Sequence, residues 1–336
     1  MPQTQTAAFD PVLAALAAAG EETRLRLLAL LAEAELTVSE LVTILGQSQP
    51  RISRHLKLLT EAGLIERHRE GAWAFFLMAH RGAAAALGRD ILSRLGHDDP
   101  VRASDRARLA EVRQARAEQA ARYFAAHAAN WDELRALHIA EERVETTIRD
   151  IIGKAPIYNL LDLGTGTGRM LELLAPLAAR AVGMDQSPQM LALARARLEK
   201  ADLRNVQLRQ GDIYALPFER DTYDLIIIHQ VLHYLDDPAR AVREAARALR
   251  PSGRLLIVDF APHGEENLRV HHAHRRLGFA AEEITALMQD SGLDVIERRD
   301  LVPNKKEGGK LTVSLWLGRD RRVISDALPL TLGEFA

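Results

Sequence analysis

Beyond residue 157 the sequence alternates short apolar runs with amphipathic stretches, and this alternation restricts the possible folds more than any other feature. The apolar runs occupy residues 159–163, 181–184, 206–209, 225–229 and 255–258. Strands buried on both faces of a parallel sheet form such continuous runs, and helices connect them in βαβ units. We therefore predict an α/β domain in which helices cover a mostly parallel sheet. In such a sheet, ligands bind beyond the carboxyl ends of the strands.

A glycine-rich loop follows the first run. It reads Asp162-Leu163-Gly164-Thr165-Gly166-Thr167-Gly168, and the predicted helix after it spans residues 169–179. Glycines let the backbone turn tightly and approach a ligand, and the start of the helix offers unpaired N–H groups. The dinucleotide fingerprint G-x-G-x-x-G requires a third glycine at position 169, where this chain has Arg169. The spacing therefore weakens the interpretation as a nicotinamide-dinucleotide site.

Asp185 ends the second run, 21 residues after Gly164. A carboxylate at this place can accept hydrogen bonds from both ribose hydroxyls of a nucleoside cofactor. Dinucleotide and sulfonium cofactors both use such a residue, so Asp185 alone does not separate them.

Later motifs separate these cofactors by resemblance. The loop, the sequence Gln210-Gly211-Asp212-Ile213, and the stretch from Tyr223 to Phe260 with its Arg-Pro-x-Gly turn resemble class I S-adenosylmethionine (SAM) methyltransferases, nearest the ubiquinone/menaquinone type. The resemblance implies that Asp212 accepts from the adenine amino group, that the next backbone N–H meets the ring, and that residues 311–317 form a final antiparallel strand. The implied cofactor is SAM, or S-adenosylhomocysteine (SAH) as bound effector or product. The predicted cofactor-binding residues are Asp162, Gly164, Thr165, Gly166, Gly168, Asp185, Gln186, Met190, Asp212, Ile213 and His229.

Methyl transfer is an in-line displacement that needs no metal, so the protein mainly positions the acceptor and, for oxygen or nitrogen acceptors, takes up a proton. Histidines near the strand ends are candidates for that role, namely His229, His233 and His263, beside Asp259 and the loop histidines His271, His272 and His274. The loop histidines fit a solvated helix face or a metal site equally well. Because no acceptor motif is recognisable, the catalytic residues and the methyl acceptor stay open. The chain has no cysteine, which argues against arsenic methylation.

The first eighty residues have a different pattern. Leucines at helical spacing precede a short helix that ends at Gly46, and Ser48 is a suitable N-cap for a further helix with Pro50 in its first turn. Strand-like segments at 64–69 and 73–78 then flank a Glu70-Gly71 turn. We predict a mainly α-helical, winged helix-turn-helix domain whose second helix enters the major groove of DNA. A solvated basic helix face is the alternative interpretation.

The sequence of this segment resembles that of the winged-helix repressors of the ArsR family, from GEETRLRLLALL through SQPRISRHLKLLTEAGLIERHREG. The resemblance implies a homodimer that places two recognition helices on a pseudo-palindromic, double-stranded operator. The predicted DNA-binding residues are Ser48, Gln49, Arg51, Ser53, Arg54, His55, Lys57 and Arg69. Metal-sensing members carry a cysteine pair in the segment 35–41, where this chain has Thr37 and Ser39. Hydroxyl oxygens are poor ligands for soft metals, so we expect no metal site there.

Composition sets the remaining limits. A chain of 336 residues predicts about two domains. We expect a winged helix-turn-helix domain at 1–80, a helical connector, dimerisation and lid segment at 81–156, the methyltransferase domain at 157–320 and a tail at 321–336. The formal charge is −2, but a local basic face concentrates on residues 47–69. The absence of cysteine and of a long apolar run predicts a cytoplasmic protein without a signal peptide or membrane span.

Two functions fit these expectations. The first is a transcriptional regulator, a repressor by resemblance, whose second domain senses SAM or SAH or methylates a small molecule. The second is a small-molecule methyltransferase on which the winged helix is an accessory.

Overall fold

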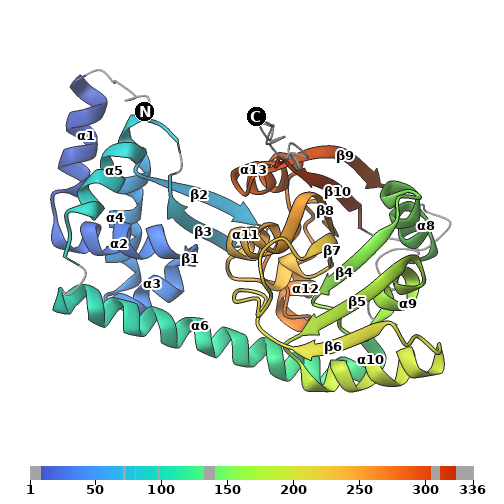
Figure 1. The fold of residues 1–336 in the computed structure, drawn as a ribbon. Helices are drawn as coiled ribbons and strands as arrows, with labels where there is room; N and C mark the ends of the chain where they lie inside the picture. Colours follow the sequence, from blue (N-terminus) through green and yellow to red (C-terminus); the bar gives the residue numbers. More distant parts are fainter. Residues whose placement is uncertain are drawn as a thin grey trace, which may run out of the picture. The chain divides into compact units, whose positions relative to one another are not determined.

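The chain divides into two compact units in the computed structural model, which describes residues 9–70, 73–79, 81–96, 99–131, 141–303 and 311–322. The first unit extends to Ala120 and includes Gly264–Val270, and the second begins at Ala121 and takes the remainder (Figure 1). Helix α6, Pro100–His127, contributes to both units.

The first unit is mainly helical. Its elements are α1 (Phe9–Ala19), α2 (Glu22–Glu33), β1 (Leu36–Thr37), α3 (Val38–Leu45), α4 (Gln49–Glu61), β2 (Ile65–Glu70), β3 (Trp73–Met78), α5 (Ala83–Ser93) and most of α6. Leucine and isoleucine side chains from α2, α3 and α4 form one core, in which Leu27, Ile44 and Ile52 are fully buried. Strands β2 and β3 pair antiparallel as the predicted wing, and the short β1 joins β3 at Leu36 and Phe76. The sequence did not predict β1, which is two residues long.

The second unit is an α/β domain. Its elements are η1 (Ala128–Asn130), α8 (Glu141–Ile152), β4 (Ile157–Leu163), α9 (Arg169–Leu174), η2 (Ala175–Leu177), β5 (Ala178–Asp185), α10 (Pro188–Lys200), β6 (Val206–Gln210), β7 (Tyr223–His229), η3 (Leu232–Tyr234), α11 (Pro238–Ala248), β8 (Leu249–Phe260), α12 (Glu266–His271), α13 (Ala281–Asp290), β9 (Leu293–Leu301) and β10 (Val313–Asp320). The helix predicted for residues 169–179 is shorter, because Pro176 ends α9 in a 3-10 turn and residue 178 already lies in β5.

Seven strands form one sheet in the order β6-β5-β4-β7-β8-β10-β9. The first five are mutually parallel, and β10 runs antiparallel to both neighbours, which confirms the mostly parallel sheet with an antiparallel last strand. Strand β9 was not predicted: its side chains are buried only at the two ends and alternate in exposure between them, so it has no continuous apolar run.

This topology locates a ligand site. From β4 the chain proceeds outward through β5 and β6 and then returns to β7 on the other side of β4. The strand order therefore reverses between β4 and β7, and the crevice of such a sheet lies beyond the carboxyl ends of these strands. Among the residues that the structure describes, no helix has the length and apolar character needed to cross a membrane.

Candidate functional sites

The glycine loop lies at the carboxyl end of β4. Gly164, Gly166 and Gly168 all have positive φ, of 71°, 52° and 82°, a region that side-chain-bearing residues rarely adopt. At Gly164 a Cβ would lie 2.4 Å from Cγ2 of Val231, so the packing of the loop against the segment after β7 requires glycine. At Gly166 a Cβ would contact Nε1 and Cδ1 of Trp131 at 3.7 and 3.9 Å, which are ordinary van der Waals distances, so its positive φ rather than close packing favours glycine here.

Asp185, at the end of β5, anchors the loop. Its Oδ2 accepts from the backbone N of Gly166 and its Oδ1 from that of Ser187, both at 2.8 Å. Burial raises the pKa of Asp185 above the usual aspartate value, although these backbone hydrogen bonds act in the opposite direction. The loop and the carboxylate predicted to bind ribose therefore form one hydrogen-bonded unit.

Asp162 and Thr165 shape the loop from inside. Asp162 is buried and its Oδ2 accepts from Oγ1 of Thr165 at 2.5 Å. The backbone N–H groups of Gly164 and Thr165 both donate to the carbonyl of Met184, at 2.8 and 3.0 Å. These contacts assign a positioning role to two residues that the sequence analysis grouped with the ligand contacts.

The other predicted cofactor residues follow β5, β6 and β7. Asp212 is exposed after β6, and its Oδ1 accepts from the backbone N of Tyr214 at 2.9 Å. Gln186 is exposed, Met190 is buried in α10 and Ile213 packs against the core of the sheet. His229 is half-buried at the end of β7. Asp185 at the end of β5 pairs with Gln210 at the end of β6. The carboxylates of Asp185 and Asp212 therefore lie at neighbouring strand ends.

His233, one of the candidate bases, has a buried carboxylate partner. His233 is 1% exposed and Asp259 is fully buried, and His233 Nδ1 lies 2.7 Å from Asp259 Oδ1. Asp259 also accepts from the backbone N–H groups of His233 and Phe260. Within the described residues, Nε2 of His233 has no hydrogen-bond partner. His263, by contrast, is half-buried and donates its backbone N–H to Leu277.

An aromatic cluster lies between the glycine loop and His233. The ring centroid of Phe124 is 5.4 Å from that of Trp131 and 4.9 Å from that of Tyr234, and the Tyr234 ring lies 4.0 Å from His233. Burial raises the pKa of Tyr234 well above its ordinary value, so its hydroxyl stays protonated. Tyr123 and Phe124 fall in the segment 81–156, for which the sequence predicted a connector, dimerisation and lid role, whereas the place of Tyr234 in this cluster was not predicted. Residues 132–140 of that segment lie outside the described residues.

A metal site among the loop histidines finds no support. In the part of the chain that the structure describes, no group of three or more histidine, aspartate or glutamate side chains is placed to hold a metal ion. His272 instead pairs with the hydroxyl of Tyr123, at 2.8 Å, and His274 stacks on His233.

Helix α4 presents the predicted DNA-reading residues. Ser48 is its N-cap residue, and Ile52, Leu56 and Leu59 are buried against the core. The exposed positions are Ser48, Gln49, Arg51, Ser53, Arg54 and Lys57, with Arg69 exposed on β2. The side chain of His55 is only 12% exposed and lies 3.7 Å from the Glu21 carboxylate. Burial lowers the pKa of His55, and its side chain faces the start of α2 rather than solvent.

Comparisons with known proteins identify a family for each of the two units. A family model described as a methyltransferase domain matches residues 161–257, and one described as a bacterial regulatory protein of the arsR family matches residues 21–67. The phosphatidylethanolamine N-methyltransferase of Cereibacter sphaeroides is 33% identical over 154 residues, which cover 43% of this chain and 74% of that protein. YcgJ of Bacillus subtilis, an uncharacterized methyltransferase, is 34% identical over 106 residues, which cover 31% of this chain and 42% of YcgJ. The chain thus spans less than half of the length of that relative.

A solved structure shares the fold of the second unit. The N-methyltransferase NodS from Bradyrhizobium japonicum, in complex with SAH, is 22% identical with a TM-score of 0.50, and the match covers 60% of this chain and 99% of NodS. The fold of the second unit is of the Rossmann-like class. The chain belongs to the SAM-dependent methyltransferases and carries, in addition, a helix-turn-helix module of the arsR family.

The residues present fit the cofactor of this class. The glycine loop offers backbone that a ligand can approach closely, and the carboxylates of Asp185 and Asp212 offer hydrogen-bond acceptors for a nucleoside with two ribose hydroxyls and an amino group.

Proposed function

We propose that this chain is a transcriptional regulator that binds operator DNA through α4 and binds SAM in its second unit, where it methylates a small molecule. The arrangement of Gly166, Asp185 and Asp212 at neighbouring strand ends carries the cofactor assignment. SAM supplies an electrophilic methyl group on its sulfonium sulfur when bound. The two carboxylates accept hydrogen bonds from the ribose and adenine ends, and the glycine loop lets the backbone approach the ligand.

The pair His233–Asp259 supports methyl transfer over cofactor sensing alone. Asp259 occupies Nδ1 of His233, which leaves Nε2 as the ring atom that takes up a proton from an acceptor hydroxyl or amine. Phe124, Trp131 and Tyr234 form an aromatic wall that excludes water and holds an apolar acceptor. Because His233 is buried, access to it requires movement of this wall.

Turnover with labelled SAM tests this function. The acceptor panel contains quinols, phenols and amines, and the variants are His233→Gln and Asp259→Asn. We expect methylated product with one acceptor class and a loss of kcat in both variants, with the apparent affinity for SAM retained. Absence of product with all three classes, while SAM binds, contradicts methyl transfer and leaves sensing.

Sensing is the second candidate, because a DNA-reading module and a cofactor site occur in one chain. A sensor requires DNA affinity to differ between the free and the ligand-bound states, typically by about 5- to 150-fold. Gel-shift titrations of the promoter fragment upstream of the gene, with and without saturating SAM or SAH, measure that ratio. Equal affinities in all three conditions exclude sensing of the cofactor.

The operator-binding form is a homodimer in this proposal. A two-fold axis relates the two copies of α4 in a homodimer, so that each can contact one half-site of a pseudo-palindromic operator. Helix α1 supports it, because Phe9, Leu13 and Leu16 lie on one helical face and are 86%, 57% and 46% exposed. We place the protein in the cytoplasm, where operator DNA is accessible.

A further inference from the structure

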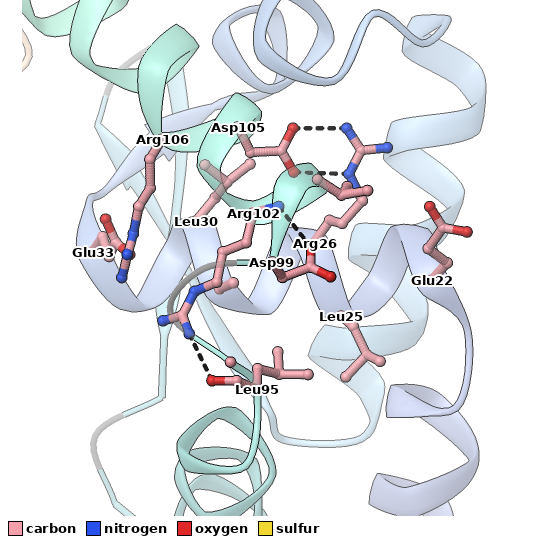
Figure 2. Close-up of a pocket in the computed structure, with 13 residues that line it drawn as sticks. Glu22, Leu25, Arg26, Leu30, Glu33, Leu95, Asp99, Arg102, Asp105 and Arg106 are labelled. Atoms are coloured by element: carbon pink, nitrogen blue, oxygen red, sulfur yellow. Dashed lines mark hydrogen bonds and ion pairs between the residues drawn. The ribbon is translucent and has the colours of Figure 1, made fainter.

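The first unit contains a cavity that neither the DNA-reading helix nor the cofactor site uses. It has a volume of about 250 Å³ and lies between α2, the start of α6 and residues Leu95, Gly96 and Asp99 (Figure 2). Leu25, Ala29, Leu30, Leu95 and Val101 line it with apolar surface. The volume lies just below the range of roughly 300–1,000 Å³ for drug-sized sites, so it suits a single-ring molecule.

Two ion pairs line this cavity. Arg26 and Asp105 form a bidentate pair with two N–O distances of 2.7 Å, and Asp105 is only 3% exposed. Arg106 Nε donates to Glu33 Oε1 at 2.7 Å. Figure 2 shows the Arg26–Asp105 pair on the α6 side of the cavity. An ionic ligand would have to compete with these pairs, whereas a neutral one leaves them intact.

Arg102 provides the cavity with an unsatisfied donor. Its Nη1 donates to the carbonyl of Leu95 at 3.1 Å, and its side chain runs from α6 toward Leu95 (Figure 2). The Nε–H of Arg102 is buried and has no acceptor among the described residues. Buried donors are almost always paired, so this atom suits an acceptor that a ligand supplies.

Contacts at the start of α2 connect the cavity to α4, the predicted DNA-reading helix. Glu21, the N-cap residue of α2, accepts from the backbone N of Arg24 at 3.0 Å and lies 3.7 Å from Nδ1 of His55 on α4. Leu25 of the cavity follows one helical turn after Glu21. A ligand that displaces the first turns of α2 therefore acts on α4 through the Glu21–His55 contact.

We propose that this cavity binds a small, neutral, largely apolar molecule with one carbonyl oxygen, which accepts from Nε of Arg102, and that its occupancy changes the affinity of α4 for DNA. The second half of this inference rests on the proposed DNA binding, and the first half does not. The site is separate from the SAM site, so the chain has two small-molecule inputs.

Binding is tested on the full chain with three single-ring probes. Acetophenone carries the carbonyl, isopropylbenzene has the same shape without an acceptor, and benzoate adds a charge. Methyl NMR of the leucine and valine side chains reports saturable shifts. We expect acetophenone to bind roughly tenfold more tightly than isopropylbenzene, the factor that corresponds to about one net hydrogen bond, and benzoate to bind most weakly.

Variants assign the binding to this cavity. Arg102→Met removes the donor at nearly constant length, and Arg122→Met, at an exposed position of the same helix outside the cavity, is the matched control. Val101→Trp fills the mouth at a position that is 41% exposed and therefore tolerates the change. We expect Arg102→Met to abolish the preference for acetophenone over isopropylbenzene, Val101→Trp to abolish binding of both, and Arg122→Met to change neither. Shifts that do not saturate, or a preference that survives Arg102→Met, overturn the proposal.

DNA titrations and the oligomeric state complete the test. With the promoter fragment, saturating acetophenone is expected to change the affinity at least about fivefold in wild type and in Arg122→Met, but not in Val101→Trp, which does not bind it. Acetophenone binding without a change in DNA affinity overturns the effector half. A chain that binds acetophenone but no DNA refutes the proposed DNA binding and upholds the site. If the probes do not bind and Val101→Trp alters the oligomeric state, the cavity is an interface between copies and the proposal fails.

Discussion

At the scale of single residues, Asp185 connects the glycine loop to the predicted ribose site. Both of its carboxylate oxygens accept backbone N–H groups, from Gly166 and Ser187. An asparagine can satisfy only one of these donors, because its amide nitrogen is itself a donor. We expect Asp185→Asn to weaken SAM binding by about 1.5–3 kcal/mol, the loss of one charge-assisted hydrogen bond, while the fold is retained. Calorimetric titration with SAM measures it; Asp290→Asn, an exposed aspartate of the same unit, is the control, and equal affinity for both variants contradicts the assignment.

The raised pKa of Asp185 adds a pH dependence of known sign. Burial favours the protonated form in the free protein, whereas ribose hydroxyls require the carboxylate as acceptor. The affinity for SAM should therefore rise as the pH passes through the raised pKa of Asp185, which lies above the ordinary aspartate pKa of about 3.9. At higher pH the affinity should stay constant. The contribution of Asp185 to the free energy of unfolding changes with pH in the opposite direction. It is greatest below the pKa that Asp185 has in the unfolded chain, and it is lost as the pH rises through the higher pKa of the folded protein. Titrations across pH on wild type and Asp185→Asn check this, since the variant should lack the dependence.

At the scale of elements, the sequence predicted those segments whose side-chain pattern is set locally. Helix α4 begins after Ser48 as expected, with Pro50 in its first turn, although the Ser48 side chain makes no capping hydrogen bond. Strand β9 escaped prediction because four consecutive charged residues, 297–300, interrupt its apolar residues, so it has neither a continuous apolar run nor a regular alternation. The approach of Trp131 to Gly166, and of Tyr234 to Phe124, also could not be predicted, since these contacts depend on how distant segments pack. The ligand roles of the loop residues remain predictions.

Helix α3 depends on a capping box at Thr37. The Thr37 side chain accepts from the backbone N of Glu40, and the Glu40 carboxylate accepts from the backbone N of Thr37 at 2.8 Å. Thr37, one of the two residues that stand in the segment where metal-sensing members of the arsR family carry cysteines, therefore caps a helix in this chain. We expect Thr37→Ala to lower the free energy of unfolding of the first unit by about 1 kcal/mol. Thermal melts measure it, with Thr43→Ala on the exposed face of the same helix as control; equal Tm values for both variants would show that the cap is not needed.

Helix α4 is expected to read base edges with its first turns. Arg51 is exposed on this helix, and a bidentate contact to guanine is worth about 1–3 kcal/mol. Arg51→Ala should therefore weaken operator binding by that amount and relax specificity at one base pair, whereas Lys57→Ala at a phosphate should reduce the salt slope by about one. Gel shifts at several salt concentrations separate the two effects, with Arg122→Ala on α6 as control. Unchanged binding in both α4 variants would place the DNA contact elsewhere.

At the scale of the whole molecule, operator binding depends on whether two copies assemble. Helix α1 buries Ala15, Ala18 and Ala19 in the core of the first unit, while its other face exposes Phe9, Leu13 and Leu16. An exposed surface of large apolar side chains on a helix whose opposite face is already buried is typical of an interface, and a second copy would cover it through two-fold symmetry.

Leu13→Glu tests this assembly. A buried, unpaired carboxylate at a two-fold contact is placed against its own symmetry mate, so both desolvation and repulsion oppose association. We expect light scattering to show a dimer for wild type and for the control Ala14→Glu, which lies at an exposed position beside the apolar face, and a monomer for Leu13→Glu. Because a monomer engages one half-site at a time, its operator affinity should fall by roughly 10²-fold or more. A wild-type monomer that binds the operator tightly would instead show that one copy suffices.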